Sequence, residues 1–331
     1  MLYCKMNRQR MLPACRKGHL MRKLEISMLN QQMHTDPIYA IAESEQRYTQ
    51  QLTRIALDIL KHRKEKPILL LSGPSGSGKT TSALRIEQLL EGWGCAAMVL
   101  SMDNYYLPES QTPQALNEHG VVDYESPYRL DIPLLNEHLE RLSRCEPIHL
   151  PVFNFAKQCR EPGKTIQRRP NELVILEGIH ALNPEVTGNA GAFASCIYVS
   201  VRTRLQAEDG ALLHPSKIRL MRRLIRDRFF RGRESVDTFR LFESVSRGEH
   251  QYIMPFKHRA AYQIDTFIDY EPSVYGSILL PDLLNIADTY PDYAQYADIA
   301  AFLQALEPVP QDLVPGISLV REFIGGSTFH Y

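Results

Sequence analysis

The segment Gly73–Thr80 restricts the fold of this chain more than any other feature of the sequence. It reads GPSGSGKT and fits the pattern G-x-x-x-x-G-K-[ST]. The apolar run ILLL at residues 68–71 precedes it, as expected of a strand buried on both faces of a sheet. Residues 82–91 follow with apolar side chains every three or four positions, which indicates an amphipathic helix. This order predicts a phosphate-binding loop. The alternative is a glycine-rich turn that binds nothing.

The chemistry of this loop indicates a nucleoside triphosphate. Its glycines allow successive backbone N–H groups to converge on phosphate oxygens, and the following helix adds its positive N-terminal end. Lys79 can reach the β- and γ-phosphates, and Thr80 can offer a hydroxyl to Mg²⁺. The sequence contains no N-K-x-D, so nothing supports guanine recognition. The predicted nucleotide contacts are Gly73, Pro74, Ser75, Gly76, Ser77, Gly78, Lys79, Thr80 and Thr81.

Strands and helices alternate through most of the chain, which predicts an α/β fold with a parallel central sheet. The expected strands are residues 68–71, 96–101, 173–176, 197–201 and 266–268. The expected helices are residues 43–64, 82–91, 131–143 and 216–230, with Asp131 as the N-cap of the third. We therefore predict a three-layer P-loop NTPase fold.

Two carboxylates follow expected strands. Asp103 comes directly after residues 96–101, and Glu177 ends the strand at 173–176. Ligands of open α/β sheets bind at the carboxyl ends of the strands, so both side chains are expected beside the phosphate-binding loop. Asp103 could accept a proton from an attacking hydroxyl, and Glu177 could bind Mg²⁺ through water. The alternatives are an aspartate that caps a turn and a solvated glutamate at a strand end.

The helix expected at 216–230 is rich in arginine. A line of guanidinium groups on one face suits a multiply charged phosphate, because each group can pair with two oxygens. A solvated basic face and a nucleic-acid patch are the alternatives. The arginines of this region are Arg219, Arg222, Arg223, Arg226, Arg228, Arg231 and Arg233.

Five motifs in a fixed order resemble the uridine kinase branch of the phosphoribulokinase/uridine kinase family. The resemblance covers roughly residues 67–270. The REFIGG sequence at 321–326 is similar to a bacterial subgroup of uridine kinase-like nucleoside kinases. Beyond the phosphate-binding loop, the motifs are Asp103-x-x-Tyr106, Asp123-Tyr124-Glu125-Ser126-Pro127, Phe153-Asn154-Phe155 with Arg160, Ile175-Leu176-Glu177-Gly178-Ile179, and Arg223-x-x-Arg226-Asp227 with Arg231-Gly232-Arg233.

The resemblance implies an ATP- and Mg²⁺-dependent phosphotransferase that acts on the 5′-hydroxyl of a nucleoside, most simply uridine or cytidine, in pyrimidine salvage. It implies a helical arginine lid that closes over ATP. It assigns catalysis to Lys79, Asp103 and Arg226, further ATP contacts to Arg231 and Arg233, and the metal to Thr80, Asp103 and Glu177. The implied nucleoside contacts are Tyr106, Glu125, Phe153, Phe155, Gln158 and Arg223.

The acceptor motifs depart from the family pattern. Phe153-Asn154-Phe155 stands where Tyr-Asp-Phe is usual, Gln158 replaces a histidine, and Glu125 replaces an aspartate that binds ribose. An ordinary core hairpin would also contain aromatic residues at 153 and 155. A phosphosugar or pantothenate therefore stays open as the acceptor. A nucleotide-binding regulatory or RNA-associated protein is the alternative from another class.

Composition limits the partners. The chain has 38 basic and 38 acidic residues, so a general attraction to nucleic acid is not indicated. No apolar run is long enough to span a bilayer. The six cysteines show no metal-ligand spacing and indicate reduced thiols in a cytoplasmic protein. A homo-oligomer stays open.

We expect four segments along the chain. They are a basic, disordered leader (1–40), an N-terminal helix (41–66), a P-loop kinase domain (67–275) and a C-terminal helical extension (276–331) with a helix near 292–306. A transit peptide or an RNA-binding arm is the alternative for the leader.

Overall fold

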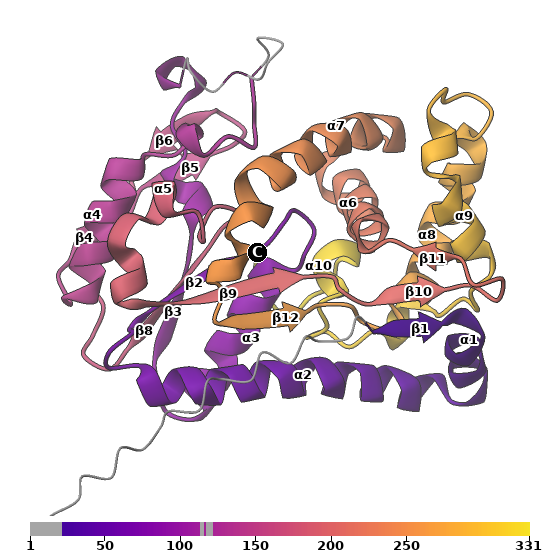
Figure 1. Ribbon diagram of the computed structural model, residues 1–331, viewed down its shortest axis with the longest axis horizontal. Coiled ribbons are helices and arrows are strands. Elements are labelled where there is room, and N and C mark those ends of the chain that lie inside the picture. The colour runs from indigo at the N-terminus through magenta and orange to yellow at the C-terminus, as the bar shows by residue number, and fades with distance from the viewer. Residues whose placement is uncertain (1–21, 113–115, 117–121) are drawn as a thin grey trace, which may run out of the picture.

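A sheet of five parallel strands forms the centre of the protein (Figure 1), whose computed structural model describes residues 22–112, 116 and 122–331. Every residue of two neighbouring inner strands, β2 (Ile68–Ser72) and β8 (Leu173–Glu177), is buried, which explains their nearly continuous apolar sequences. In spatial order the strands are β12 (Tyr262–Asp265), β9 (Ala194–Ser200), β2 (Ile68–Ser72), β8 (Leu173–Glu177) and β3 (Ala97–Ser101).

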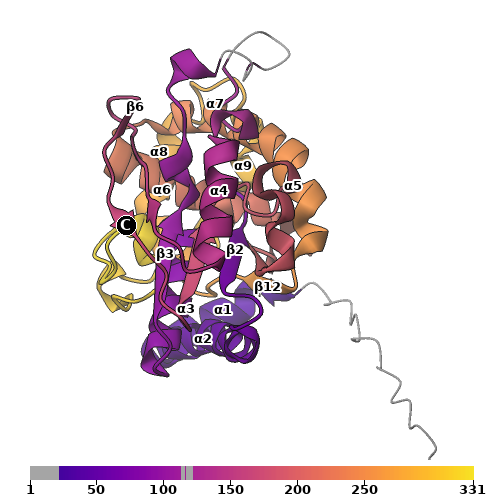
Figure 2. The same cartoon turned by 90° about the vertical axis from the view of Figure 1, so that its left-hand side faces the viewer.

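Helices cover both faces of this sheet. Side chains alternate along β2, so Leu69 and Leu71 join one hydrophobic core while Ile68 and Leu70 join another. The first core includes α3 (Lys79–Gly92) and α6 (Pro215–Arg231). The second includes α4 (Ile132–Ser143), which Figure 2 shows in front of the sheet. The predicted three-layer α/β fold with a parallel sheet is confirmed.

The N-terminal elements correct one expectation. The described chain begins with β1 (Lys23–Glu25), α1 (Ile26–Thr35) and α2 (Pro37–His62). Leu29 and Met33 of α1 are buried in the first core, as are Tyr48 and Leu52 of α2. The prediction of a disordered leader is therefore wrong for residues 22–40, whose apolar side chains pack. Residues 1–21 lie outside the described residues.

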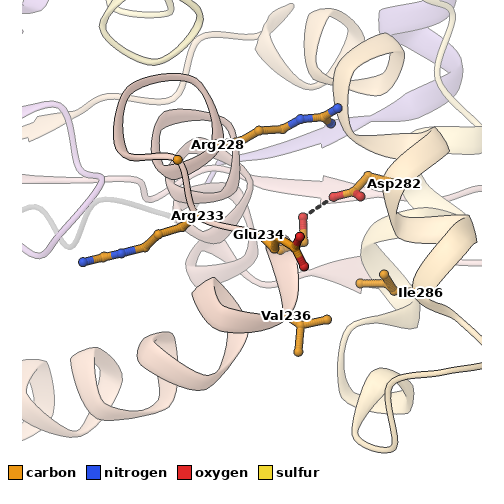
Figure 3. Close-up of a pocket in the computed structure, with 8 residues that line it drawn as sticks. Arg228, Arg233, Glu234, Val236, Asp282 and Ile286 are labelled. Atoms are coloured by element: carbon orange, nitrogen blue, oxygen red, sulfur yellow. Dashed lines mark hydrogen bonds between the residues drawn. The ribbon is translucent and has the colours of Figure 1, made fainter.

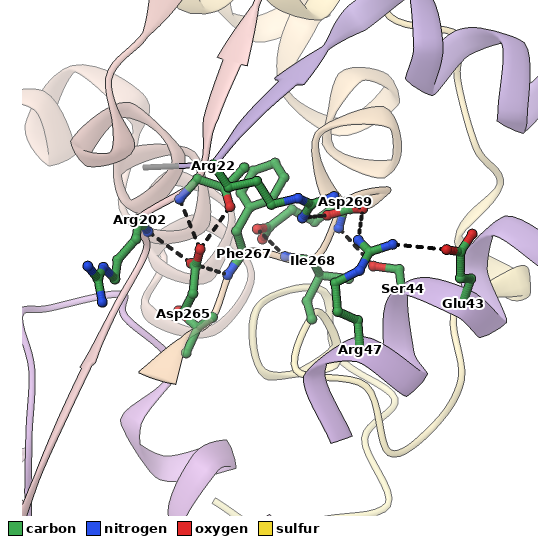
Figure 4. A network of polar contacts seen from close by, with 12 residues as sticks. Arg22, Glu43, Ser44, Arg47, Arg202, Asp265, Phe267, Ile268 and Asp269 are labelled. Atoms are coloured by element: carbon green, nitrogen blue, oxygen red, sulfur yellow. Dashed lines mark hydrogen bonds and ion pairs between the residues drawn. The ribbon is translucent and has the colours of Figure 1, made fainter. Parts of the chain in front are cut away.

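An ionic network fixes this N-terminal part to the main domain (Figure 4). Arg22 donates two hydrogen bonds of 2.6 Å to the carboxylate of Asp269, and Arg47 of α2 pairs with the same group. Nearby, Asp265 at the end of β12 accepts hydrogen bonds from the backbone N–H groups of residues 202, 203 and 267. Arg22, helix α2 and residues 202–203 thus all bind to the carboxylates of Asp265 and Asp269.

The C-terminal third differs from expectation in three ways. The last strand is β12 at 262–265 rather than 266–268, because the Asp265 carboxylate accepts a hydrogen bond from the Phe267 N–H and so ends the strand. Helix α8 (Glu271–Ile286) was not predicted, since Pro272 and Pro281 interrupt its sequence pattern. The helix expected at 292–306 begins later, as α9 (Ala297–Gln304). The preceding residues turn so that Tyr290 and Tyr296 stack on Phe239.

Short elements complete the described chain. A small β-hairpin contacts the short helix after β3, a second two-stranded sheet encloses that hairpin in the chain, and a three-stranded sheet joins β1 to two later strands. None of the helices in the described part of the chain is long and apolar enough to cross a membrane. The remaining elements are β4 (Ile148–His149), β5 (Val152–Asn154), β6 (Cys159–Glu161), β7 (Thr165–Ile166), α5 (Pro184–Thr187), β10 (Arg204–Gln206), β11 (Leu212–Leu213), α7 (Ser235–Gly248) and α10 (Arg321–Ile324).

Candidate active site

The loop between β2 and α3 wraps around the start of α3, as the sequence predicts. Gly78 has φ = +77° in the left-handed region and forms the N-cap of α3. Gly73 lies against β9, where an added Cβ would come within 2.1 Å of the Val199 carbonyl oxygen. The backbone can take this path only with glycine at both positions. The amides at the N-terminus of α3 are therefore available to an anion.

Lys79 is the first residue of α3, and no carboxylate of the described residues lies within ion-pairing distance of its ammonium group. Its Nζ makes one long hydrogen bond of 3.3 Å, to the carbonyl oxygen of Pro74 in the loop itself. Burial lowers the pKa of Lys79, while the nearby carboxylates of Glu177 and Asp103 act in the opposite direction. A half-buried cation held by its own loop suits a phosphate oxygen.

The two predicted carboxylates lie on neighbouring strands. Ser101 at the end of β3 pairs with Glu177 at the end of β8, and its hydroxyl donates a 2.8 Å hydrogen bond to Glu177 Oε1. Burial, together with the charge of Asp103, raises the pKa of Glu177 to about 7. Asp103 reaches solvent in the short helix that follows β3, yet the surrounding protein also raises its pKa. The two groups share one electrostatic environment with Lys79.

These groups fit Mg²⁺ held mostly by phosphate and water. The described residues contain no cluster of three or more His, Cys, Asp or Glu side chains that could hold a metal by themselves. Mg²⁺ in kinases keeps several waters and uses one or two carboxylates together with the phosphates of the substrate. The predicted set Thr80, Asp103 and Glu177 supplies two carboxylates and a hydroxyl, which matches that requirement.

The arginines of α6 fall into two groups, contrary to the expectation of a single phosphate-binding line. Arg222 is completely buried, pairs with Glu271 at 2.7 Å, and donates to the Gly76 carbonyl oxygen. Arg219 pairs with Glu249 at 2.6 Å and donates to the Ser75 carbonyl oxygen. These two side chains hydrogen-bond to backbone carbonyl oxygens of the phosphate-binding loop and stabilise its shape. Their guanidinium groups are already paired with carboxylates, so they are not available to a phosphate.

The second group lies toward the C-terminal end of α6 and surrounds the buried carboxylate of Asp227. Arg223, Arg231 and Arg233 lie 3.3, 3.0 and 3.8 Å from its oxygens. Arg226 differs from them, since it makes no hydrogen bond or ion pair with any described residue, and its buried Nε has no partner there. Burial and the nearby charge of Arg231 lower the pKa of Arg226 to about 10. An unpaired, half-buried guanidinium at this place fits a polyphosphate.

A cavity of about 470 Å³ lies between the C-terminal end of α6, the start of α7 and α8 (Figure 3). Figure 3 shows the Arg228 side chain extending toward the helix that carries Asp282, and Ser235 donates a hydrogen bond to Asp282. Lys79, Asp103, Glu177 and Arg226 are all missing from its lining. The cavity therefore lies outside the candidate site.

Three predicted acceptor residues lie beside these groups. Burial raises the pKa of Glu125 to about 7, and the neighbouring charges that act on this carboxyl include Arg223, Lys79 and Asp103. Arg223 also donates a 3.1 Å hydrogen bond to Ser75 Oγ of the phosphate-binding loop. Burial raises the pKa of Tyr106, and the charges of Asp103 and Glu125 add to this effect. The ribose-contact candidates are thus close to the candidate base.

The predicted base-contact residues form an aromatic cluster on the β5–β6 hairpin. The rings of Phe153 and Phe155 are 5.0 Å apart, and each lies within 6 Å of the Tyr106 ring, at 5.9 and 5.7 Å. Phe153 is buried while Phe155 is half exposed. Gln158 sits at the exposed turn with φ = +51° and donates to the Phe155 carbonyl oxygen. The structure joins the two rings to Tyr106 and leaves Gln158 bonded within its own turn.

Sequence reasoning missed several residues that lie in this site. His180 is buried beside Tyr252 and the Glu125 backbone, and burial lowers its pKa to about 4. It stands three residues after Glu177, and that spacing was the available signal. Asp123 accepts hydrogen bonds from the Glu125 N–H and the Tyr252 hydroxyl. Glu322, from the distant C-terminal segment, contacts the start of α3. It belongs to the REFIGG motif, to which the sequence assigned no role in the site.

Comparison with known proteins identifies the family of this chain. A uridine kinase of Anoxybacillus flavithermus is 31% identical over 199 residues, which cover 60% of this chain and 85% of that protein. A uridine kinase of a Geobacillus species is 33% identical over 199 residues, which cover 59% of this chain and 84% of that protein. A structure described as a putative fructose transport system kinase from a Silicibacter species is 18% identical, with a TM-score of 0.45, and covers 64% of this chain and 98% of its own. The family model described as phosphoribulokinase/uridine kinase matches residues 68–270. This chain belongs to the phosphoribulokinase/uridine kinase family.

Proposed function

We propose that this protein transfers the γ-phosphoryl group of ATP to the 5′-hydroxyl of a pyrimidine nucleoside, uridine or cytidine, as in pyrimidine salvage. One observation carries the proposal. Two cations without carboxylate partners among the described residues, Lys79 and Arg226, lie in one electrostatic environment with three carboxyl groups whose pKa values are raised. A protein that only binds ATP needs the cations. Transfer also requires a group that takes the proton of the acceptor hydroxyl and a group that binds the acceptor. In this proposal Asp103 and Glu125 have these two roles.

Each group of site residues has its own role in the proposed phosphoryl transfer. The loop amides and Lys79 hold the phosphates, and Asp103 takes the proton of the 5′-hydroxyl as its oxygen bonds to the γ-phosphorus. The bond from the γ-phosphorus to the β,γ-bridging oxygen breaks, and ADP leaves with that oxygen. Arg226, with Arg231 and Arg233, offsets the charge of the transferring group. When bound, Mg²⁺ neutralises phosphate charge, and Thr80, Asp103 and Glu177 would hold it.

The raised pKa of Asp103 suits this role. A carboxylate with an ordinary pKa is a weak base at neutral pH, and partial desolvation by the surrounding protein makes Asp103 a stronger one. In this proposal Glu125 and Arg223 bind the ribose, and Phe153 and Phe155 contact the base. We assign these steps to residues 67–275, with the N-terminal elements and the C-terminal extension packed on them.

The test is a transfer assay with purified protein, ATP and Mg²⁺. The acceptors are uridine, cytidine, adenosine, ribulose 5-phosphate and pantothenate. We expect the two pyrimidine nucleosides to give the highest kcat/KM. Asp103→Asn should bind ATP as the wild type does and transfer about 10²–10⁴-fold more slowly. Phosphorylation of a non-nucleoside alone would refute the nucleoside proposal, and ATP binding without transfer to any of these acceptors would favour a regulatory protein.

A further inference from the structure

The C-terminal segment 317–331 packs against the phosphate-binding loop and α3. A Cβ added to Gly78 would come within 2.5 Å of the Leu319 side chain, and Arg85 of α3 donates to the Ile317 carbonyl oxygen at 3.0 Å. The guanidinium of Arg222 lies 5.2 Å from the centre of the Phe323 ring, and Phe323 is completely buried. This segment is therefore packed into the fold directly beside the phosphate-binding loop.

The same segment closes a pocket of about 610 Å³ next to the loop. Thr80 of α3 and the lid residues Arg226, Phe230 and Arg231 line one side. The other side consists of the C-terminal residues Arg321, Glu322, Gly325, Gly326, Ser327, Phe329, His330 and Tyr331. A volume of this size suits a small organic ligand, and rings beside polar groups suit a planar base with its sugar.

Glu322 makes the contact that links this pocket to the phosphates. Its Oε2 accepts a 3.3 Å hydrogen bond from the Thr81 N–H and a 2.5 Å hydrogen bond from the Thr81 hydroxyl. The N–H groups at the start of this helix are the donors that a bound phosphate uses. A carboxylate oxygen thus occupies a position suited to a phosphate oxygen. The charge of Glu322 also acts on Lys79 and Arg226, so it lies within the electrostatic reach of the donor site.

We propose that residues 321–331 form the pocket for the base and ribose of the donor nucleoside triphosphate, and that Glu322 occupies a phosphate position at Thr81 until the nucleotide displaces it. This inference rests on the proposed function. The acceptor candidates Glu125, Phe153 and Gln158 do not line the pocket, so it serves the donor. Two anions cannot share the Thr81 donors. The nucleotide must therefore displace the Glu322 carboxylate from Thr81, which weakens its binding. Contacts between the base and the ring side chains of the pocket offset this cost.

The first test removes the charge of Glu322. Isothermal titration of the full-length protein with inorganic tripolyphosphate and with ATP compares the wild type, Glu322→Gln and Glu307→Gln. Glu307 is an exposed glutamate outside the pocket and serves as the matched control. We expect Glu322→Gln to bind tripolyphosphate at least about fivefold more tightly, because a like charge near the site is gone. Unchanged or weaker tripolyphosphate binding would overturn the role of Glu322.

The second test separates the nucleoside from the phosphates, and it stands even if Glu322→Gln does not fold. Phe329→Ala should weaken ATP binding about tenfold and leave tripolyphosphate binding unchanged, because a lost ring contact affects only the base. Thr328→Ala, one residue away and outside the pocket lining, should change neither. Equal ATP affinities of Phe329→Ala and the wild type would overturn the pocket assignment. A wild-type protein that binds neither ligand would refute the proposed function together with this inference.

Discussion

The donor side and the acceptor side of this site are built in different ways. The donor side comes from one continuous loop between a buried strand and a helix. Arg219 and Arg222 stabilise this loop by donating hydrogen bonds to its carbonyl oxygens. The acceptor side comes from the segment after β3, the residues around Glu125, and the β5–β6 hairpin, with residues 113–115 and 117–121 outside the described chain. The first side depends on backbone geometry, and the second depends on side chains from distant segments. Changes on the donor side should therefore abolish transfer, while changes on the acceptor side should alter selectivity.

The largest effect is expected from Lys79→Ala. Transfer should fall by at least about 10³-fold, because the phosphates lose the cation that the loop holds against them. The melting temperature should stay close to that of the wild type, since the hydrogen bond that Lys79 would lose is a long one within its own loop. Lys64→Ala, an exposed lysine before β2, is the control. Turnover by a folded Lys79→Ala protein at the wild-type rate would contradict the donor site.

The two groups of arginines on α6 should separate activity from stability. Arg226→Gln should lower kcat by about 10²–10³-fold and leave the free energy of unfolding unchanged, because Arg226 has no partner among the described residues to lose. Arg222→Met should instead lower the free energy of unfolding by about 3–5 kcal/mol, since Glu271 would keep an unpaired buried charge. Urea denaturation and steady-state kinetics on both variants provide the comparison, with Arg228→Gln as an exposed control. A large loss of stability in Arg226→Gln would show that this arginine is structural.

On the acceptor side, Glu125→Gln should lose activity and gain stability. The pKa of Glu125 in the folded protein, about 7, lies above its ordinary value of 4.5. The folded state then binds the proton more tightly than the unfolded state, so the free energy of unfolding falls as pH rises from about 4.5 through 7. The amide introduced by Glu125→Gln stays neutral at every pH, so this variant should be the more stable protein at pH 8. Its kcat/KM for uridine should fall about tenfold or more, because a charged acceptor of ribose hydroxyl groups is lost.

Denaturation of both proteins at pH 5 and pH 8 checks the prediction for Glu125. The wild type should lose more stability between the two values than Glu125→Gln. An equal change in both proteins would mean that Glu125 ionises normally in the fold.

The smallest effect is expected from Phe153→Tyr. Recognition by ring faces and shape discriminates between similar ligands by only about 10–200-fold, so the wild type should use uridine and cytidine within about tenfold of each other. A phenol hydroxyl adds a polar contact to the base edge and should change that ratio, while the KM for ATP stays the same. Kinetics with both nucleosides test this, and Phe193→Tyr, outside the aromatic cluster, is the control. An unchanged ratio would remove Phe153 from the base site.

The sequence predicted the parts that depend on local pattern. The strand before the glycine-rich loop, the loop itself and Asp131 as the N-cap of α4 need only nearby residues, and the structure has the strand, the loop and the cap where they were expected. The carboxyl ends of β3 and β8 followed from the parallel sheet. Because β3 and β8 are parallel neighbours, Asp103 and Glu177 lie at the same edge of the sheet, as the sequence predicts.

The remainder depends on contacts between distant segments. A row of arginines at helical spacing does not reveal that Glu271 and Glu249 already pair with two of them. Glu322 meets Thr81 across 241 positions of sequence, and no local pattern encodes that contact. Residues 22–40 were grouped with the basic stretch that precedes them, because their apolar side chains find partners only in the folded core.

The most direct test of the account compares uridine with 5′-deoxyuridine, which lacks only the proposed attacking hydroxyl. The measurement is the formation of phosphorylated nucleoside and of ADP by the purified protein with ATP and Mg²⁺. The account predicts stoichiometric uridine 5′-phosphate and ADP from uridine, and no phosphorylated product from 5′-deoxyuridine. Phosphorylation of 5′-deoxyuridine, or of neither nucleoside, would contradict it.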